Sequence, residues 1–350
     1  MPDPTTSARF LTVEPSDGHY ESFYLKACPP GGGQGLWIRH TVHKRPGAEP
    51  TASVWFTFFD AESGGPVASK GTQPASALSA PEGGYITVGD STLTPSHAAG
   101  ALRTRSLDAE WDLSIDGSDA PLHHLPSSWM YRAPVPRTKL MSPHPGATFT
   151  GRVRIGDRRL DVSGWRGMVG HNWGAEHAER WIWMHGTAFA DRPQDTWFDM
   201  SAGRIALGPV TSPWVANGVL CLDGRRHRLG GVGRTRSTEI SEGPGGARFA
   251  FAGRGVSVRG TATASRKDTV AWRYADPDGS EHHVLNCSIS NLELYVERRG
   301  EPATTLVVAR GAAFELGMRE TDHGIVVQPE ADGGSAARDR AVRSGRDASG

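Results

Sequence analysis

Apolar and polar residues alternate along short segments through most of this 350-residue chain. A period of two is typical of β-strands, whose successive side chains point to opposite faces of a sheet, and helical periodicity is scarce. Turn residues interrupt the alternation, because the chain contains 44 glycines and 24 prolines. The clearest segments are 36–43, 53–59, 109–115, 181–189, 256–264 and 291–297. This pattern predicts antiparallel sandwiches or barrels rather than alternating strands and helices.

The length of the chain predicts two domains or one large all-β unit. Six prolines lie within 121–145, too many for a central strand, so we expect an extended crossover there. After it, the segment 151–164 is typical of a hairpin with a Gly156-Asp157 turn, which would open a second barrel. The expected parts are a flexible N-terminus (1–16), an N-terminal barrel with the crossover (17–148), a C-terminal barrel (149–329) and a disordered tail (330–350) that has almost no large apolar residue.

Charge and cysteine content restrict the partners of the protein. Acidic and basic residues number 38 each, so no net positive charge concentrates nucleic acid around the chain. Cys28, Cys221 and Cys287 are odd in number and widely spaced, which is typical of free thiols in a reducing compartment. No window reaches the roughly 18 apolar residues of a membrane span. We therefore expect a cytoplasmic protein without nucleic-acid binding or an integral membrane segment; peripheral membrane contact and the oligomeric state stay open.

The segment 164–200 is the densest in chemically interesting side chains. Its tryptophans predict either a large aromatic core or an apolar wall for a ligand, because each indole N–H needs a partner. It also contains His171, His177 and His185. The five tryptophans, of 11 in the chain, are Trp165, Trp173, Trp181, Trp183 and Trp197.

A strand over 180–189 would be buried on both faces. Such a strand is expected where a barrel wall packs against a neighbouring barrel, with one of its faces lining the lumen. His185 would then be a lone polar group in an apolar cavity, either hydrogen-bonded as part of the core or active in proton transfer. One face carries Trp181, Trp183, His185, Thr187 and Phe189, and the other carries Ile182, Met184, Gly186 and Ala188.

Other chemistries find less support in the sequence. His171, His177 and His185, with Glu176 or Glu179, could hold zinc or iron, but their spacing matches no compact ligand motif. There is no G-x-S-x-G elbow, no Walker lysine, and no glycine-rich loop between a strand and a helix. Hydrolysis by a catalytic triad and nucleotide binding are therefore not expected.

The string Gly170-His171-Asn172-Trp173-Gly174 resembles the H-N-W-G signature of the carotenoid 1,2-hydratase-like proteins. This lipocalin-type superfamily is related to tocopherol cyclases and to lipocalin-like Diels–Alderases of fungi. The residue pattern of the family's first barrel is similar to that of residues 21–26, 37–39 and 55–60. The pattern of its crossover is similar to that of residues 125–140. The resemblance spans most of 17–330. It implies an all-β fold of two consecutive lipocalin-like antiparallel β-barrels with an apolar pocket for an isoprenoid or polyketide.

The resemblance also implies protonation of a carbon–carbon double bond, with tryptophan faces stabilising the resulting cation. Asp199 could be the acid if apolar surroundings keep it protonated, or it could cap a turn. The chain has Gly170 where the family often has aspartate, and Phe198 where a tyrosine is expected. The candidate catalytic residues are His171, His185 and Asp199, and the candidate substrate contacts are Trp173, Trp181, Trp183, Trp197, Phe198 and Phe189.

These observations favour a lyase or isomerase that isomerises, cyclises or hydrates an apolar isoprenoid or polyketide by general acid catalysis, without a redox cofactor. Two alternatives stay open. One is a non-catalytic carrier of a lipid or polyene, in which the tryptophans line a pocket. The other is a metal enzyme built on the histidines.

Overall fold

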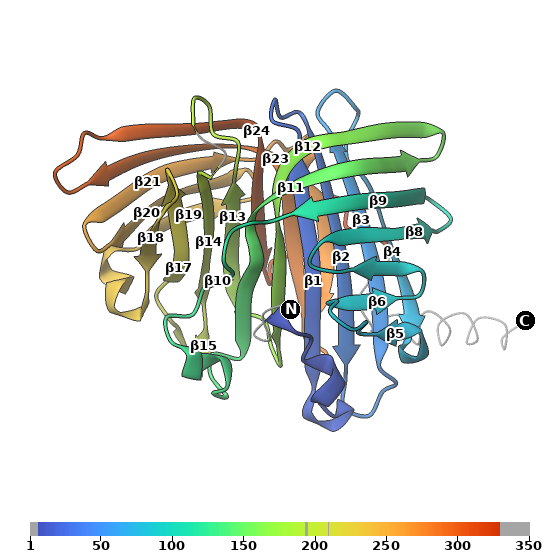
Figure 1. The fold of residues 1–350 in the computed structure, drawn as a ribbon. Coiled ribbons are helices and arrows are strands. Elements are labelled where there is room, and N and C mark those ends of the chain that lie inside the picture. Colours follow the sequence, from blue (N-terminus) through green and yellow to red (C-terminus); the bar gives the residue numbers. More distant parts are fainter. Residues whose placement is uncertain (1–5, 193–194, 209, 330–350) are drawn as a thin grey trace, which may run out of the picture.

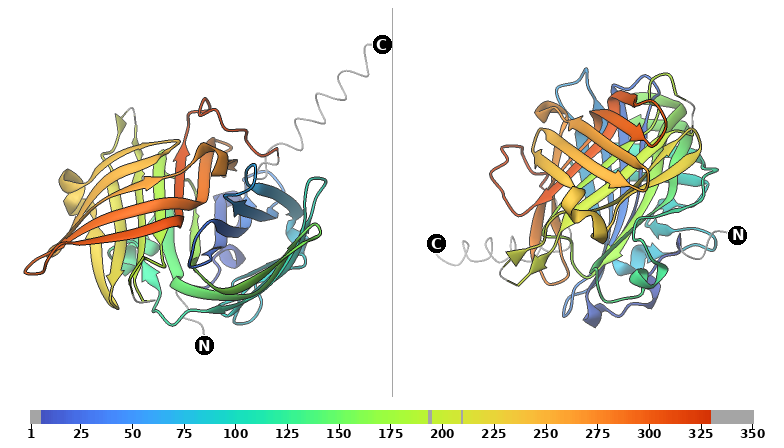
Figure 2. Two further views of the ribbon diagram at one scale, coloured as in Figure 1. Left: turned by 90° about the horizontal axis from the view of Figure 1, so that it is seen from above. Right: turned by 90° about the vertical axis from the view of Figure 1, so that its left-hand side faces the viewer.

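The computed structural model describes residues 6–192, 195–208 and 210–329, and it confirms the predicted all-β fold. Antiparallel strands form two large sheets, each curled into a barrel (Figure 1). The barrels lie side by side when the molecule is seen from above (Figure 2). Short 3₁₀ helices occur at Phe10–Thr12, Pro15–Asp17, Ala75–Ala77, Ser128–Tyr131, Val232–Ser237 and Arg266–Asp268.

The first barrel is built from a sheet of 12 strands. They are β1 His19–Cys28, β2 Gln34–Lys44, β3 Thr51–Asp60, β4 Val67–Pro74, β5 Leu78–Ser79, β6 Ile86–Val88, β7 Ser91–Leu93, β8 His97–Arg103, β9 Asp108–Asp116, β10 Leu122–His123, β11 Thr138–Ile155 and β12 Arg158–Gly174. Their order is β4-β3-β2-β1-β12-β11-β9-β8-β7-β6-β5, with β10 paired to β11. The barrel is nearly closed, and the Ser69 and Thr104 hydroxyls hydrogen-bond between β4 and the end of β8 at 2.8 Å.

The second barrel is built from a sheet of ten strands. They are β13 Arg180–Gly186, β14 Trp197–Arg204, β17 Val215–Leu222, β18 Arg225–Gly230, β19 Glu239–Gly243, β20 Gly246–Gly253, β21 Val256–Thr263, β22 Val270–Ala275, β23 Glu281–Arg298 and β24 Thr304–Met318. Their order is β18-β17-β14-β13-β24-β23-β21-β20-β19, with β22 paired to β23. Leu229 of β18 pairs with Gly253 of β20 and closes the barrel. A separate ribbon joins β15 Ala206–Leu207 to β16 Val210–Thr211.

Alternation along the strands fills both barrels with apolar side chains. Phe23, Phe56 and Phe149 are fully buried in the first core, and Phe198 and Phe251 are equally buried in the second. Burial stabilises each such side chain by about 1.5–3 kcal/mol. The interiors of the barrels are therefore packed cores.

Aromatic side chains on the outer face of the first barrel join it to the second. Leu36, Ile38 and Phe56 point into the first barrel, so their neighbours Trp37 and Trp55 point outward. The Trp55 ring lies 4.9 Å from Trp272 and 5.6 Å from Tyr274, both on β22 of the second barrel. The two barrels thus share an aromatic interface that contains Trp37, Trp55, Trp272 and Tyr274.

The boundary predicted between residues 148 and 149 is wrong. It falls inside β11, which pairs with β9 and β12, and β12 pairs in turn with β1. Both strands therefore belong to the first barrel, and the sheets divide after Gly174. The two-residue turn at Gly156-Asp157 is confirmed, because Ile155 pairs with Arg158. Pro143 and Pro145, assigned to the crossover from the sequence, lie in β11, where two register shifts accommodate them.

The described part of the N-terminal segment packs onto the first barrel. Phe10 is buried in the barrel core, and the backbone N–H groups of Arg9 and Phe10 donate to the Glu21 carboxylate. These contacts anchor Arg9 and Phe10 to the barrel, within the segment 1–16 that was expected to be flexible. Residues 1–5 and the predicted tail 330–350 lie outside the described residues. Within the ranges described, no helix has both the length and the apolar character needed to cross a membrane.

Candidate functional site

A cavity of about 660 Å³ lies where the two barrels meet. This volume is within the range of small-molecule pockets. Strands β1, β2 and β12 line it from the first barrel, and β13, β14, β17, β22 and β24 line it from the second. The proline-rich crossover forms another wall, with Leu125, Pro126, Trp129, Met130, Val135 and Pro136.

The two faces of β13 explain why the cavity lies outside the second barrel. Ile182 and Met184 point into the second core, whereas Trp181 and Trp183 line the cavity. The alternation was predicted correctly, but the tryptophan face was expected to line the barrel lumen. That expectation is wrong, because Phe198 and Phe251 help to fill the lumen.

Two glycines allow large rings to reach the cavity wall. A Cβ atom on Gly317 would lie 2.2 Å from the Trp181 ring, and one on Gly170 would lie 2.2 Å from the Tyr24 ring. Trp181 and Tyr24 both line the cavity. The Tyr24 ring therefore gives a physical reason for glycine directly before the H-N-W-G string.

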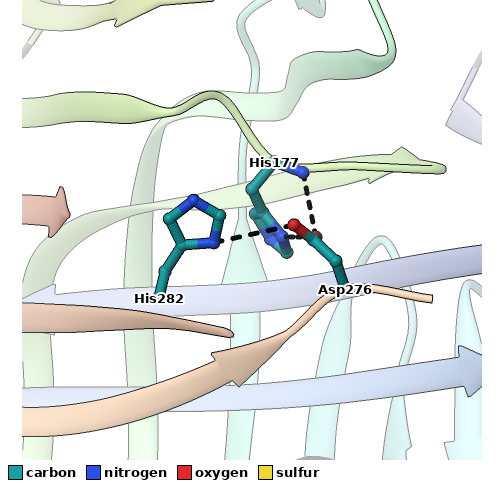
Figure 3. Close-up of side chains that lie close together, drawn as sticks. All are labelled: His177, Asp276 and His282. Carbon is teal, nitrogen blue, oxygen red and sulfur yellow. Dashed lines mark hydrogen bonds and ion pairs between the residues drawn. The ribbon is translucent and has the colours of Figure 1, made fainter. Parts of the chain in front are cut away.

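His177, Asp276 and His282 form a buried cluster at the cavity wall (Figure 3). Imidazole Nδ1 of His177 lies 2.6 Å from Oδ1 of Asp276, and the His177 backbone N–H donates to the same oxygen at 2.9 Å. His177 lines the cavity, and its Nε2 is buried and has no hydrogen-bond partner among the described residues. The Tyr20 ring stacks on His177 at 3.9 Å. The carboxylate and the stacked ring thus fix the orientation of the imidazole.

The charges in this cluster follow from its contacts. Burial raises the pKa of Asp276, but the hydrogen bonds and charge of His177 outweigh it and leave that pKa below its usual value. Burial lowers the pKa of His282 to about 3, with further lowering by His177 and Arg319. At neutral pH Asp276 is therefore ionised and His282 is neutral. Nδ1 of His282 lies 3.6 Å from Oδ2 of Asp276.

Arg39 is a buried cation in the cavity wall. It lies on β2, is 3% exposed, and stacks over Tyr274 with 4.1 Å between the guanidinium carbon and the ring centre. No described carboxylate forms an ion pair with it. A positive charge therefore faces an otherwise largely apolar cavity.

Asp199 is held ionised behind the cavity wall. It accepts hydrogen bonds from Ser142 Oγ at 2.5 Å and from Trp183 Nε1 at 3.1 Å, and lies 3.4 Å from His124 Nε2. Burial raises its pKa, but His124, His185 and Ser142 outweigh burial and leave the pKa below its usual value. The expectation of a protonated Asp199 acid is therefore wrong. Asp199 is also in the middle of β14, so it caps no turn.

His185 lies directly opposite Asp199 in the β13–β14 ladder. Its Nε2 hydrogen-bonds to the Pro145 carbonyl at 2.8 Å, and its Nδ1 has no hydrogen-bond partner among the described residues. Burial lowers its pKa to about 4, although the charge of Asp199 acts in the opposite sense. His185 does not line the cavity, because the irregular β11 segment around Pro145 covers it.

The lowered pKa of His185 predicts a pH dependence of stability. The unfolded state binds a proton near pH 6.5, whereas the folded state does so only near pH 4. His185 therefore destabilises the fold by up to about 1.4 kcal/mol per pH unit as pH falls from 6.5 to 4. Urea unfolding of wild type and His185→Gln across this window measures the effect. We expect a shallower pH dependence for the variant, and equal slopes would contradict the assignment.

The histidine of the H-N-W-G string serves the first barrel rather than the cavity. His171 Nε2 donates to Glu21 Oε1 at 2.8 Å, and its ring stacks on Phe23 at 3.8 Å. Asn172, its neighbour, faces the cavity instead, and the Ser22 hydroxyl donates to its side-chain oxygen. The candidate catalytic role of His171 therefore has no geometric support, because strand alternation turns it away from the ligand space.

Four of the six expected substrate contacts lie away from the cavity. Trp173 stacks on His171 at 4.4 Å, and Trp197 donates to Asp119 at 2.7 Å. Phe189 and Phe198 belong to the core of the second barrel. The expected strand 180–189 ends at Gly186, so the alternation does not extend to Phe189. The two residues that do line the cavity are Trp181 and Trp183.

The expected metal ligands do not converge. His171 binds Glu21, His177 binds Asp276, and His185 binds the Pro145 carbonyl. Glu176 and Glu179 are paired with Arg137 and Arg319. In the described part of the chain, the group of metal-type donors that lies close together is His177, Asp276 and His282, all within 4.8 Å of one another.

Sequence reasoning missed Arg39, Asp276 and His282. Asp276 precedes a Pro-Asp-Gly turn, so its surroundings predict a solvent-exposed loop. The hairpin of β22 and β23 brings Asp276 and His282 together, and the loop after β12 adds His177 from about 100 residues earlier in the sequence. No local sequence motif predicts the contact of His177 with Asp276 and His282. An arginine within the apolar alternation of 36–42 was the one available signal for Arg39.

The fold and the cavity define a protein of two lipocalin-like barrels with a small-molecule pocket at their junction. Among solved structures, a Nitrosomonas europaea protein assigned as AttH (NE1406) is similar with a TM-score of 0.53 and 12% identity, over 91% of this chain and 99% of that one. CghA gives 0.52 and 13%, over 89% and 90%. Kievitone hydratase from Nectria haematococca gives 0.51 and 9%, over 87% and 90%. These likenesses establish the shared two-barrel fold.

Sequence comparison finds similarity over about half of the chain. The uncharacterized proteins Rv0493c and MT0513 of Mycobacterium tuberculosis, from strains H37Rv and CDC 1551, are each 31% identical to this chain over 184 residues. The match covers 52% of this chain, which spans about half the length of these curated relatives. No family model matches the chain.

Proposed function

We propose that this protein is a lyase or isomerase that binds a small hydrophobic molecule between its barrels and moves a proton on it through His177. The observation that supports this proposal is the His177–Asp276 pair at the wall of a largely apolar cavity. The ionised carboxylate favours a proton on Nδ1, which leaves Nε2 available to accept or return a proton. This assignment moves the general acid–base role from His171, His185 and Asp199 to His177.

The reaction class follows from what one imidazole can do in such a site. Nε2 takes a proton from a carbon of the substrate and returns it to another carbon for isomerisation. In hydration, Nε2 takes a proton from water as the oxygen adds to one carbon of the double bond, and it then delivers that same proton to the neighbouring carbon. A cyclisation that starts by proton removal uses the same transfers, and a pericyclic cyclisation needs only the walls of Trp37, Trp181 and Trp183 to hold the chain in a folded shape.

The names of the structural neighbours agree with this class. Kievitone hydratase is named for a hydration, and CghA has been solved with Sch210972 bound. At 9–14% identity these proteins support the kind of chemistry and not a particular substrate. An isoprenoid or polyketide substrate stays part of the proposal.

The proposal is tested with 5-nitrobenzisoxazole, a flat apolar probe whose C3–H proton is removed by a base while its N–O bond breaks to give a cyano-phenolate. We expect wild type to catalyse this elimination and His177→Gln to lower the rate by about 10²-fold or more. The matched control is His97→Gln, because His97 forms a similar pair with Asp112 at 2.7 Å on the exposed surface. A His177→Gln rate equal to wild type would contradict the proposal, and so would an inactive wild type.

The His177, Asp276 and His282 cluster favours a second candidate, a metal-dependent enzyme. Two imidazoles and one carboxylate are a donor set that suits iron or zinc, and His282 has no hydrogen-bond partner on either nitrogen among the described residues. Dialysis against a chelator decides between the candidates. Probe turnover that survives with less than stoichiometric metal supports the acid–base proposal, and turnover lost with the metal and restored by zinc or iron supports the second candidate.

A further inference from the structure

Arg39 lies buried among aromatic rings at the junction of the barrels. Its guanidinium carbon is 4.1 Å from the centre of the Tyr274 ring, 5.2 Å from Trp55 and 5.9 Å from Trp37. Cation–π contacts of this kind stabilise a guanidinium but do not satisfy its N–H donors. NH1 of Arg39 has no hydrogen-bond partner among the described residues.

The carboxylates of the cavity are already engaged elsewhere. Glu176 pairs with Arg137 at 3.0 Å, and Glu179 pairs with Arg319 at 3.2 Å. Glu315 accepts hydrogen bonds from three uncharged donors, Trp181 at 3.0 Å, Asn286 at 3.2 Å and the Tyr274 hydroxyl at 3.5 Å. Burying a charge without a counter-charge is costly, so proteins normally pair such a group. Arg39 has no carboxylate partner among the described residues.

We infer that Arg39 binds an acidic group of the substrate, either a carboxylate or the enolate of a carbonyl compound. The inference rests on the proposed function, because it assigns the substrate class of the same cavity. The Tyr274 ring lies under the Arg39 guanidinium and 5.7 Å from the His177 ring. Arg39 and His177 therefore lie beside the same aromatic ring of the cavity wall, within reach of one small substrate.

The position of Arg39 also determines which intermediates the site stabilises. A guanidinium in an apolar cavity stabilises a developing negative charge, such as the oxygen of an enolate. The same charge repels a carbocation in surroundings of low dielectric constant. Arg39 therefore favours a mechanism that removes a proton next to a carbonyl group. It disfavours the mechanism expected from the sequence, in which tryptophan faces stabilise a substrate cation.

Two probes of the same shape test this inference by isothermal titration calorimetry. 2-Naphthoic acid is ionised at neutral pH, whereas 2-naphthamide is neutral and equally flat. We expect wild type to bind the acid about 10- to 100-fold more tightly than the amide, as for a charge-assisted contact inside a protein. Arg39→Met should remove this preference, and Arg39→Lys should keep part of it.

Arg137→Met is the matched control, because Arg137 lines the same cavity but already has Glu176 as its partner. We expect this variant to keep the preference for the acid. Equal binding of the two probes by wild type, or a preference that survives in Arg39→Met, would overturn the inference. Selective binding of the acid by His177→Gln, without catalysis of the benzisoxazole elimination by wild type, would contradict the enzymatic proposal and leave the Arg39 site supported.

Discussion

Asp276→Asn is expected to lower turnover of 5-nitrobenzisoxazole by about 10²- to 10⁴-fold with little change in the affinity for 2-naphthoic acid. The carboxylate holds the His177 proton on Nδ1 and keeps Nε2 available as the base. Asparagine presents an amide in its place, which can donate to Nδ1 and favour the opposite tautomer. Initial rates at saturating probe, together with calorimetric binding, separate the loss of catalysis from a loss of binding.

Asp112→Asn is the control for this substitution. Asp112 accepts from His97 Nε2 at 2.7 Å on the exposed outer surface of the first barrel. The change therefore removes a carboxylate from a histidine pair without touching the cavity. We expect an unchanged rate. An Asp276→Asn rate within a factor of two of wild type would contradict the role assigned to this pair.

Glu21→Leu is expected to reduce the free energy of unfolding by about 3–5 kcal/mol. The Glu21 carboxylate is buried and accepts from His171 at 2.8 Å and from the backbone N–H of Phe10 at 2.6 Å, and it pairs with His19 at 3.0 Å. Leucine leaves these donors buried without an acceptor. The urea midpoint measures the loss, and a constant m-value shows that both proteins unfold in the same way.

The pKa of Glu21 gives this prediction a pH signature. Burial raises the pKa of this carboxyl, but His171 and His19 outweigh burial and hold it at about 2. A lowered pKa contributes stability that is present above about pH 4.5 and is lost as the pH falls toward 2. Glu21→Leu should flatten that part of the profile. Glu110→Gln is the control, because its carboxylate is exposed beside Arg103 and Arg154; an equal loss in both variants would contradict the account of Glu21.

Alternation in the sequence was sufficient to predict the all-β class and several strands. The segments predicted at 36–43 and 53–59 lie within β2 and β3, and the turn at Gly156-Asp157 is where it was expected. The partners of each strand were not predictable in the same way. β11 and β12 pair with β9 and β1, which are far away in sequence, and no local pattern distinguishes this pairing from a hairpin of the second barrel.

The candidate site was predictable in part, for reasons visible at β13. Both faces of this strand are apolar, so its period revealed which side chains share a face but not which face looks into a barrel. Trp181 and Trp183 were therefore predicted correctly to share a face. That face was expected to line the barrel lumen, but it lines the cavity between the barrels. Asp276 and His282 carry no local signal, because their meeting with His177 depends on contacts between segments about 100 residues apart.

The most direct test of the central claim is an X-ray structure of the protein with 6-bromo-2-naphthoic acid, in which anomalous scattering locates the bromine atom. We predict one bromine peak in the cavity between the barrels, beside Trp181, with the carboxylate within hydrogen-bonding distance of Arg39. A bromine peak inside either barrel, beside Phe198 or Phe56, would contradict the assignment of the ligand site.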